Sequence, residues 1–415
     1  MEQVELETEA PLYGGLCLSR HNGVVFVKGT IPGERVLAQL REQKRDYSIA
    51  DAVEILHRSQ DRVEARCPVF SVCGGCHYQH ISYERQLAIK EEIVTDCLHR
   101  IGKTDIALGA TLAGQQWHYR SKAQFKLSDD GTMGFYKEDS RDVVSVRECF
   151  ICKNEINGLL RKLSGARFVR GIKEIHILTG ENTIAYIKGT DMDEGRLDFF
   201  LDVGFDGAAL EGGPSVGDTC CRFMLGQQSY TVSAQTFFQA NWELNLRLIQ
   251  LLSEALGDIE GMTILDAYGG AGNFSLPLSL HCRGATVIES NPHAIADGKR
   301  NIENNQLKNI KYISRPLEKL INAKAKEPGA SDSGKEANKY DVVIVDPPRV
   351  GLTTVGISRL LALSPRRIAY VSCNPATFAR DIHKLSQQYT LASVRLVDMF
   401  PNTYHCEVLG ILNRR

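Results

Sequence analysis

The sequence predicts an α/β protein in which a doubly wound domain follows two smaller, mostly β domains. From about residue 231 onward, short apolar runs alternate with helical patterns, as in a parallel sheet covered by helices on both faces. Residues 5–60 are short apolar segments separated by turn signals. Residues 110–230 alternate strands and turns, with one or two helical stretches. The chain has 415 residues, which is enough for two or three domains.

The first domain is expected over residues 1–62. Its apolar segments, at 24–27 and 35–40, lie between turn signals at Gly14-Gly15, Asn22-Gly23 and Pro32-Gly33. Several short strands within sixty residues are typical of a small β-barrel of the oligonucleotide-binding (OB) kind. An SH3-like barrel without a ligand would give the same pattern.

The second domain is expected over residues 63–230, and it opens with a cysteine cluster. Three cysteines fall within ten residues around Gly74-Gly75: Cys67, Cys73 and Cys76. Thiolates this close repel one another unless a cation or a cluster holds them. A fourth ligand would come from elsewhere, with Cys149 the best candidate and Cys152 and Cys97 as rivals. The spacing fits zinc and an iron–sulfur cluster equally well.

A helix is expected over residues 82–101, directly after this cluster. Apolar residues recur at helical spacing on one face, at Leu87, Val94, Leu98 and Ile101, and Gly102 ends the pattern. Charged residues occupy the other positions. We expect the apolar face to pack on the third domain.

The third domain is expected over residues 231–415. Its strand candidates are 263–266, 285–289, 342–346 and 367–371, all short and nearly continuously apolar. The stretch 323–339 is rich in Lys, Glu, Gly, Ser and Ala, so we expect a flexible surface loop there.

Reactive side chains follow these strands, where open α/β sheets bind their ligands. The strand at 367–371 leads to Cys373, a candidate nucleophile, although a free cysteine is often only a core residue. Acids stand at the other strand ends: Asp266 before a glycine loop at 269–272, then Glu289 and Asp346. Glu289 is placed to accept hydrogen bonds from a ribose, whereas Asp266 would repel a pyrophosphate. The pattern favours S-adenosylmethionine, with its positive sulfonium, over NAD.

Composition restricts the setting of the protein. No apolar run is long enough to span a membrane, and the acidic N-terminus lacks a signal-peptide core. We therefore expect a cytoplasmic protein without membrane association or an obligate protein partner. In that compartment twelve cysteines indicate metal binding or catalysis more than disulfides. The near balance of 49 basic and 50 acidic residues weighs mildly against nucleic acid, but a local basic face is compatible with it.

Together these motifs resemble the RNA 5-methyluridine methyltransferases, especially the iron–sulfur branch that modifies 23S ribosomal RNA. The resemblance spans nearly the whole chain. It is carried by the cysteine cluster, by the glycine loop with its strand-end acids, and by three further segments: Phe238-Gln239-Ala240-Asn241, Ser372-Cys373-Asn374-Pro375 and 400–407. It implies a class I (Rossmann-like) methyltransferase domain, and an N-terminal barrel of the RNA-binding TRAM type.

The resemblance also implies roles for single residues. Cys373 would be the nucleophile and Glu407 the proton acceptor. The S-adenosylmethionine contacts would be Gln239, Tyr268, Asn273, Glu289 and Asp346. The [4Fe–4S] ligands would be Cys67, Cys73, Cys76 and Cys149. The chain departs from the family at Pro316, where some members have a polar cofactor contact, and at Asn402, where His is frequent.

The chemistry explains why these residue types are needed. Uridine C5 is a weak nucleophile, and a thiolate that adds to C6 activates it. C5 then takes the methyl group, a base removes the C5 proton, and the cysteine leaves. The expected partner is RNA, most often a loop in 23S rRNA whose uridine flips out of the stack. The alternatives are an RNA-binding factor without catalysis, and a methyltransferase acting on cytosine or DNA.

Overall fold

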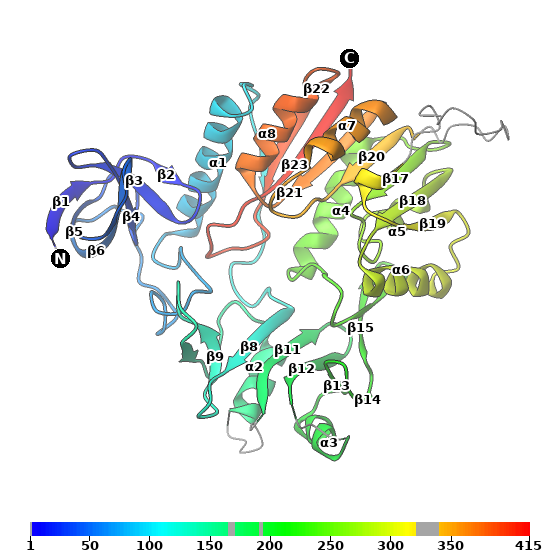
Figure 1. Cartoon of the computed structure of the whole chain (residues 1–415), viewed down its shortest axis with the longest axis horizontal. Helices are drawn as coiled ribbons and strands as arrows, with labels where there is room; N and C mark the ends of the chain where they lie inside the picture. Colours follow the sequence, from blue (N-terminus) through cyan, green and yellow to red (C-terminus); the bar gives the residue numbers. More distant parts are fainter. Residues whose placement is uncertain (1, 165–170, 191–193, 321–339) are drawn as a thin grey trace.

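Three lobes make up the computed structural model, which describes residues 2–164, 171–190, 194–320 and 340–415. The N-terminal lobe lies to one side, the central sheet lies below, and the catalytic domain, named for the site described in the next subsection, lies above (Figure 1). The stretch 323–339, expected to be a flexible loop, lies outside the described residues. Within the described ranges, no helix has both the length and the apolar character needed to cross a membrane.

The N-terminal lobe is a six-stranded sheet with the order β1-β5-β6-β4-β3-β2. Its alternate residues are buried around a small core that includes Val4, Val27 and Val36. The sheet curls on itself (Figure 1), while an OB-like or TRAM arrangement stays a prediction. Its strands are β1 Gln3–Glu7, β2 Pro11–Leu12, β3 Leu16–Arg20, β4 Val24–Lys28, β5 Arg35–Gln43 and β6 Tyr47–His57.

The central lobe is built on a seven-stranded sheet, with the helices α2 and α3 packed on its core. Its elements are β8 Lys122–Leu127, β9 Met133–Tyr136, β10 Val143–Ser145, α2 Asn154–Leu163, β11 Ile172–Thr179, β12 Thr183–Gly189, α3 Glu194–Val203, β13 Gly207–Leu210 and β14 Ser215–Gly217. A separate hairpin, β15 Cys220–Leu225 and β16 Gln228–Ser233, follows. The hairpin is bonded to the catalytic domain, because Asn301 and Asn305 accept from backbone amides of β16.

The catalytic domain holds an eight-stranded sheet with the order β19-β18-β17-β20-β21-β23-β22-β7. Its strands are β17 Thr263–Ala267, β18 Gly284–Glu289, β19 Ile310–Ser314, β20 Val342–Val345, β21 Arg367–Ser372, β22 Tyr389–Val397 and β23 Glu407–Arg414. Its helices are α4 Trp242–Leu256, α5 Ser275–Ser279, α6 Pro292–Asn304, the 3-10 helix η1 Leu317–Lys319, α7 Thr354–Leu363 and α8 Pro375–Leu385. The direction of the chain order changes between β17 and β20, where doubly wound sheets bind ligands.

The four predicted strands form a parallel arrangement, but the sheet as a whole is mixed. Strands β17 to β21 are parallel, but β23 is antiparallel to both β21 and β22. The apolar runs predicted the central strands because burial on both faces removes polar positions. Strand β22, next to the edge strand β7, carries polar and exposed residues, so it gave no such signal.

Two segments from outside residues 231–415 complete this domain. Strand β7 (Gly109–Leu112) pairs with β22 at the edge of the sheet. Helix α1 (Tyr83–Arg100) packs against α8. Val94 and Leu98 of α1 join the main catalytic core, and Ile89 and Ile93 lie with Ala379 of α8 in a second cluster. The catalytic sheet is therefore not built from one continuous stretch of chain.

Candidate active site

The candidate residues converge because the strand ends that carry them lie at the same end of the sheet. Strands β17, β18, β20 and β21 are parallel, so their carboxyl ends lie together. Strand β23 is antiparallel to β21, with Ser372 opposite Val408. The amino end of β23 therefore lies beside the carboxyl end of β21. This pairing brings Cys373 and Glu407 to the same edge, although 33 residues of chain separate them.

The loop after β17 is shaped by glycines and by the next strand. The backbone amides of Tyr268 and Gly269 both donate to the carbonyl oxygen of Ile288. A Cβ on Gly269 would come within 2.6 Å of Val287, so only glycine fits this approach. The Gly270 amide donates to a Glu289 carboxylate oxygen at 3.0 Å. The loop therefore packs closely against the end of β18.

Glu289 is the predicted ribose acceptor, and its carboxylate is held in place. Its second oxygen accepts from the amides of Ser290 at 2.6 Å and Asn291 at 2.7 Å. Because a carboxylate has about four acceptor positions, three amide bonds leave room for a ligand hydroxyl. The side chain is partly exposed, which suits a binding role.

Asp266 does not line the crevice, and the expectation that it would do so is wrong. Its side chain is completely buried, and one oxygen accepts from the Ser275 amide at 3.2 Å. Burial raises its pKa to about 7, because the charged form loses its hydration. Asp266 therefore supports the first turn of α5 from beneath the glycine loop.

The other predicted cofactor residues lie in different surroundings. Tyr268 is partly buried, and its hydroxyl donates to Glu318 at 3.3 Å. Gln239 is 7% exposed. Asn273 exchanges two amide hydrogen bonds with Asn245 of α4, at 2.8 and 3.0 Å. Both polar atoms of Asn273 thus already have a protein partner, and a cofactor contact would use the second N–H of its nitrogen or the remaining lone pair of its oxygen.

The candidate nucleophile Cys373 follows β21 and is half-buried. Burial raises the pKa of its thiol to about 11, and the nearby carboxyl groups of Glu407 and Asp346 raise it further, whereas Arg349 opposes them. The resting thiol is therefore protonated at neutral pH. Asn374 accepts from the amides of Ala376 and Thr377, so it caps α8 directly after the thiol.

Glu407 and Asp346 form the acidic side of this site. Glu407 is only 4% exposed, and burial raises its pKa well above the usual range, with a smaller contribution from Asp346. The pKa of Asp346 rises to about 7, mainly through burial and then through Asp266. Arg349 lowers the pKa of Glu407. A thiol, two proton-accepting groups and one cation thus share a site with little water.

A residue of the N-terminal lobe also reaches this site. The Tyr13 hydroxyl donates to the backbone carbonyl of Cys373 at 3.1 Å. Its ring packs edge-on against Tyr404, with the centroids 5.4 Å apart. The first domain is thus in contact with the segment that carries the nucleophile.

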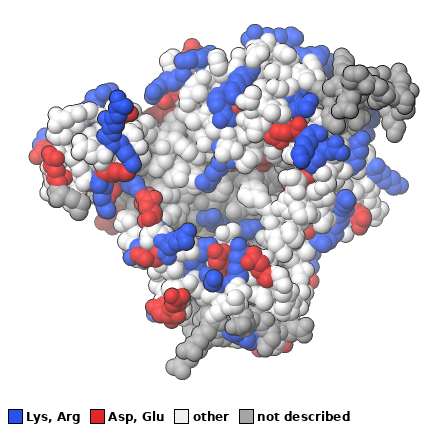
Figure 2. Space-filling model, viewed as in Figure 1, with Lys and Arg blue, Asp and Glu red and all other residues white. Residues whose placement is uncertain are grey.

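A cleft opens where the three lobes meet. It has a volume of about 760 Å³ and is lined by residues of all three lobes. Basic side chains lie in and around this hollow (Figure 2). The basic lining residues are Lys28, Arg120, Lys122, Lys126, Lys137 and Arg349. Rings of Tyr404, His405 and the 72%-exposed Phe237 lie among them. Cations and aromatic faces are the groups that bind single-stranded nucleic acid.

The structure sorts the candidate cysteines. Four of them line one small cavity of about 50 Å³: Cys67, Cys73, Cys76 and Cys149. The rival Cys152 is fully buried behind Cys149, and the rival Cys97 lies on α1 in the core beside α8. Among the described residues, no group of three or more His, Cys, Asp or Glu side chains is placed to hold a single metal ion.

Sequence reasoning missed several residues of this site. Arg349, three residues after the strand-end acid Asp346, was not predicted, and Tyr13 gave no local signal. Asn241, the last residue of the segment 238–241, has a structural role. Its side-chain oxygen caps α4, and its side-chain amide donates to the carbonyl of Met399. Position in a strand-end motif could have drawn attention to Arg349 and Asn241.

The sequence of the chain is similar to those of RNA methyltransferases. The profile of the tRNA (Uracil-5-)-methyltransferase family matches residues 224–415. An uncharacterized RNA methyltransferase of Aquifex aeolicus is 33% identical, over 99% of this chain and 98% of its own length. The 23S rRNA (uracil(1939)-C(5))-methyltransferase RlmD of Yersinia enterocolitica is 30% identical, over 96% of this chain and 92% of its own length.

One solved structure has the same fold over almost the whole chain. It is the tRNA (uracil-54, C5)-methyltransferase of Pyrococcus abyssi, in complex with S-adenosyl-L-homocysteine. The TM-score is 0.77 at 23% sequence identity, and the match covers 98% of this chain and 100% of that one. The likeness extends beyond the α/β domain to all three lobes.

Proposed function

The chain belongs to the RNA uracil-5-methyltransferase family, and from that premise we propose that it methylates C5 of a uridine in RNA through a covalent Cys373 adduct. The observation that carries the proposal is the pairing of β21 with β23, which brings Cys373 and Glu407 to one sheet edge. Glu407 and Asp346 both act on the pKa of the Cys373 thiol, which fits a shared site.

The methyl donor is S-adenosylmethionine, which supplies an electrophilic methyl group. The residues present fit this molecule. Glu289 offers a fixed carboxylate for the ribose, and the glycine loop lets the backbone approach it closely. Tyr268 and Asp346 lie at adjoining strand ends. The relative from Pyrococcus abyssi, whose structure holds S-adenosyl-L-homocysteine, supports the same placement.

The reaction follows from the positions of the two main residues. The Cys373 thiol loses its proton to solvent, and its sulfur adds to C6 of the uracil, while Glu407 must be ionised for the later proton removal. The electron pair moves to C5, which would take the methyl group as its bond to the sulfonium sulfur breaks, so that S-adenosyl-L-homocysteine leaves. Glu407 then removes the proton from C5, the C5–C6 double bond forms again, and the sulfur leaves. Because Cys373 is half-buried, the uracil must leave its stack to reach it.

The substrate is proposed to be 23S rRNA, because the relative from Yersinia enterocolitica acts there. A tRNA uridine is the alternative, since the solved relative acts on tRNA. Mapping 5-methyluridine by mass spectrometry in both RNA pools, with and without the gene, distinguishes them. Loss of one rRNA site is expected. Loss of a tRNA site would move the substrate, and no loss in either pool would contradict the proposal.

The covalent step has its own test. RNA carrying 5-fluorouridine cannot lose fluorine as a proton, so a stable protein–RNA adduct should accumulate. We expect Cys373→Ala to abolish the adduct, and Cys282→Ala, a cysteine outside the site, to leave it unchanged. With ordinary uridine, Glu407→Gln should accumulate a methylated adduct. An adduct with Cys373→Ala would show that another residue is the nucleophile.

We further propose that Cys67, Cys73, Cys76 and Cys149 hold a [4Fe–4S] cluster. All four line one small cavity, and four cysteine thiolates are the usual ligand set of such a cluster. Iron and acid-labile sulfide in protein purified without oxygen should fall with Cys149→Ala and persist with Cys282→Ala. Stoichiometric zinc in the parent protein would contradict the assignment.

A further inference from the structure

The loop between β22 and β23, residues 398–406, leads directly into Glu407. Asn241 of the catalytic domain donates to Met399 in this loop, but most of the loop's other hydrogen-bond partners come from residues before 231. In Figure 1 it extends from the end of the sheet toward the central lobe. We propose that Gln86 and Lys90 of α1 are positioning residues for Glu407, because they hold this loop in place. This inference rests on the proposed function.

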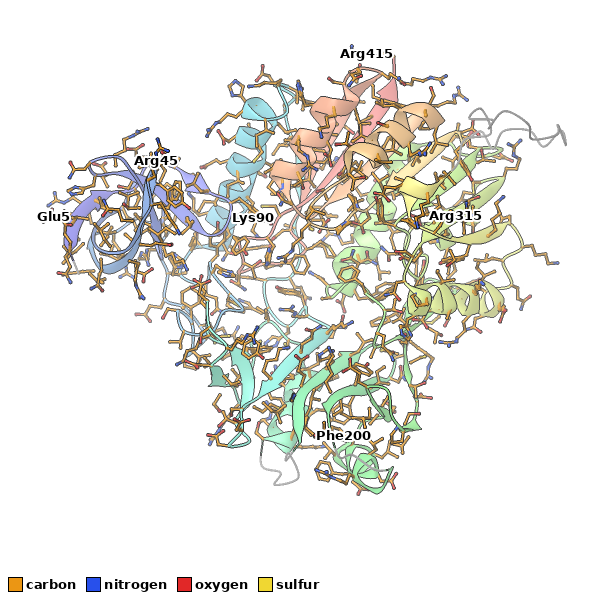
Figure 3. The ribbon with its side chains drawn as sticks, in the orientation of Figure 1. Glu5, Arg45, Lys90, Phe200, Arg315 and Arg415 are labelled. Carbon is orange, nitrogen blue, oxygen red and sulfur yellow. The ribbon has the colours of Figure 1, made fainter. Side chains whose placement is uncertain are left out.

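Lys90 anchors the start of the loop through a buried ion pair. Its ammonium lies 2.6 Å from an Asp398 oxygen, and both side chains are fully buried. The same ammonium donates to the carbonyl of Phe400 at 3.1 Å. The second Asp398 oxygen accepts from the Tyr83 hydroxyl at 2.9 Å. Lys90 lies on α1 beside the catalytic domain (Figure 3). A charge pair without water tolerates little displacement, so it restrains two points of the loop.

Gln86 anchors the middle of the loop at Asn402. The Asn402 amide donates to the Gln86 side chain at 2.8 Å, and the Gln86 amide group donates to the carbonyls of Tyr78 and Ile81. Asn402 is buried and has a φ of 65°, a left-handed conformation that non-glycine residues rarely adopt. The side chain of Asn402 also exchanges hydrogen bonds with Gln116. These bonds stabilise a backbone bend that would otherwise be unfavourable.

The same point joins the loop to the cysteine segment. The backbone amides of His77 and Tyr78, which follow Cys76 directly, both donate to the carbonyl of Asn402 at 2.9 Å. Tyr119 donates to the carbonyl of Pro401 at 3.1 Å. The loop therefore takes its position from α1 and from the segments at 77–78 and 116–119. The hydrogen bonds within the loop itself are short-range, such as the Thr403 amide to the carbonyl of Phe400.

A displaced loop should affect one step of the reaction more than the others. Cys373 lies between β21 and α8, so the sulfur that adds to C6 is not carried by the loop, which reaches it only indirectly, through the contact of Tyr404 with Tyr13. Removal of the C5 proton depends on Glu407. Loss of the anchors should therefore leave an intermediate with the Sγ–C6 bond formed, the methyl group on C5, and the C5 proton still present. Simple loss of stability would lower every step together.

The test compares two RNAs under single-turnover conditions, with Gln86→Ala and the paired variant Lys90→Met with Asp398→Asn, which leaves no unpaired charge. With 5-fluorouridine RNA, adduct formation should stay within about twofold of the parent protein. With uridine RNA, product release should slow at least tenfold, and a methylated protein–RNA adduct should accumulate on denaturing gels. Arg100→Met, an exposed cation on the same helix, is the matched control and should behave as the parent.

Two results would overturn the inference. One is an equal loss of adduct formation and turnover in both variants, which indicates a purely structural role. The other is normal release of product from uridine RNA. If the parent protein forms no adduct with 5-fluorouridine RNA, the proposed function fails instead, so the two failures are distinguishable.

Discussion

At the residue scale, burial raises the pKa values of the thiol and the carboxyl groups of the site, so they are weak acids. Cys373, Glu407, Asp346 and Asp266 all have raised pKa values, and burial is the first cause for each. Arg349 alone lowers the pKa of both reacting groups. The resting site therefore holds its protons, and the thiolate forms at a cost that falls as pH rises.

Adduct formation should consequently accelerate with pH. The Cys373 thiol has a pKa raised to about 11, so below that value each unit of increase in pH gives roughly ten times more thiolate. We expect the rate of adduct formation with 5-fluorouridine RNA to rise between pH 6 and 9. Arg349→Met should slow it at any fixed pH, because the cation that lowers the thiol pKa is gone. A rate independent of pH would show that thiol ionisation does not limit this step.

Asp266 should make stability depend on pH with a known sign. Its pKa is raised from 3.8 to about 7, so folding disfavours the charged form, and its contribution to stability is lost as pH rises through this window. Asp266→Asn keeps an acceptor for the Ser275 amide and cannot ionise. We expect Asp266→Asn to leave the free energy of unfolding unchanged at pH 3.5 and to raise it by about 2 to 4 kcal/mol at pH 8.

Urea unfolding at the two pH values measures this difference. Asp202→Asn, an exposed carboxyl on α3, is the control and should change little at either pH. An equal effect of Asp266→Asn at both pH values would show that ionisation is not its cause.

At the element scale, helix starts are built from residues beside the reacting groups. Asn374 caps α8 one residue after Cys373, and Asn241 caps α4 two residues after Gln239. Pro375 occupies the first turn of α8, where its missing amide hydrogen costs nothing. Arg380 and Asp381 of α8 hold the loop after Arg349 through the backbone of Val350 and Leu352. The motif residues thus support the site as well as acting in it.

Loss of the α8 cap should lower both stability and activity. Asn374→Ala removes the acceptor for the amides of Ala376 and Thr377, which typically costs about 1 kcal/mol. We expect a melting temperature lower by a few degrees and slower adduct formation, because Cys373 is adjacent. Asn374→Ser, which keeps a short oxygen acceptor, should recover most of the stability. Equal melting temperatures for Asn374→Ala and the parent would show that the cap is dispensable.

At the scale of the whole molecule, the site belongs to all three lobes. Tyr13 of the N-terminal lobe contacts Cys373, and Lys28 of the same lobe pairs with Glu138 and Asp139 of the central lobe. The cleft is basic although the chain as a whole carries a net charge of −1. Six basic but only two acidic side chains line this hollow. A basic surface for nucleic acid is therefore compatible with the nearly neutral total charge of the chain.

RNA binding should depend on this hollow and on salt. Lys137 lines the cleft, and its side chain is 46% exposed. Lys137→Ala should weaken binding of different RNA sequences to a similar extent. It should also reduce the slope of log affinity against log salt by about 0.7, the value for one phosphate contact to a single strand. Lys299→Ala, far from the cleft, is the control; an unchanged slope with Lys137→Ala would place the RNA elsewhere.

The sequence by itself determined the chemistry of the protein and the central strands. Cys373, Glu289 and the glycine loop were recognisable because strand ends, tight turns and buried runs restrict residue type locally. The cysteine triplet was visible for the same reason. The other features of the site depend on strand pairing and on contacts between segments that are distant in the chain. Such contacts leave no local pattern in the sequence. The antiparallel insertion of β23 put Glu407 at the same end of the sheet as Cys373, and folding of the central lobe placed Cys149, but not Cys152 or Cys97, in the cavity lined by Cys67, Cys73 and Cys76. Tertiary structure also showed that Asp266 is buried and that α1 holds the loop before Glu407.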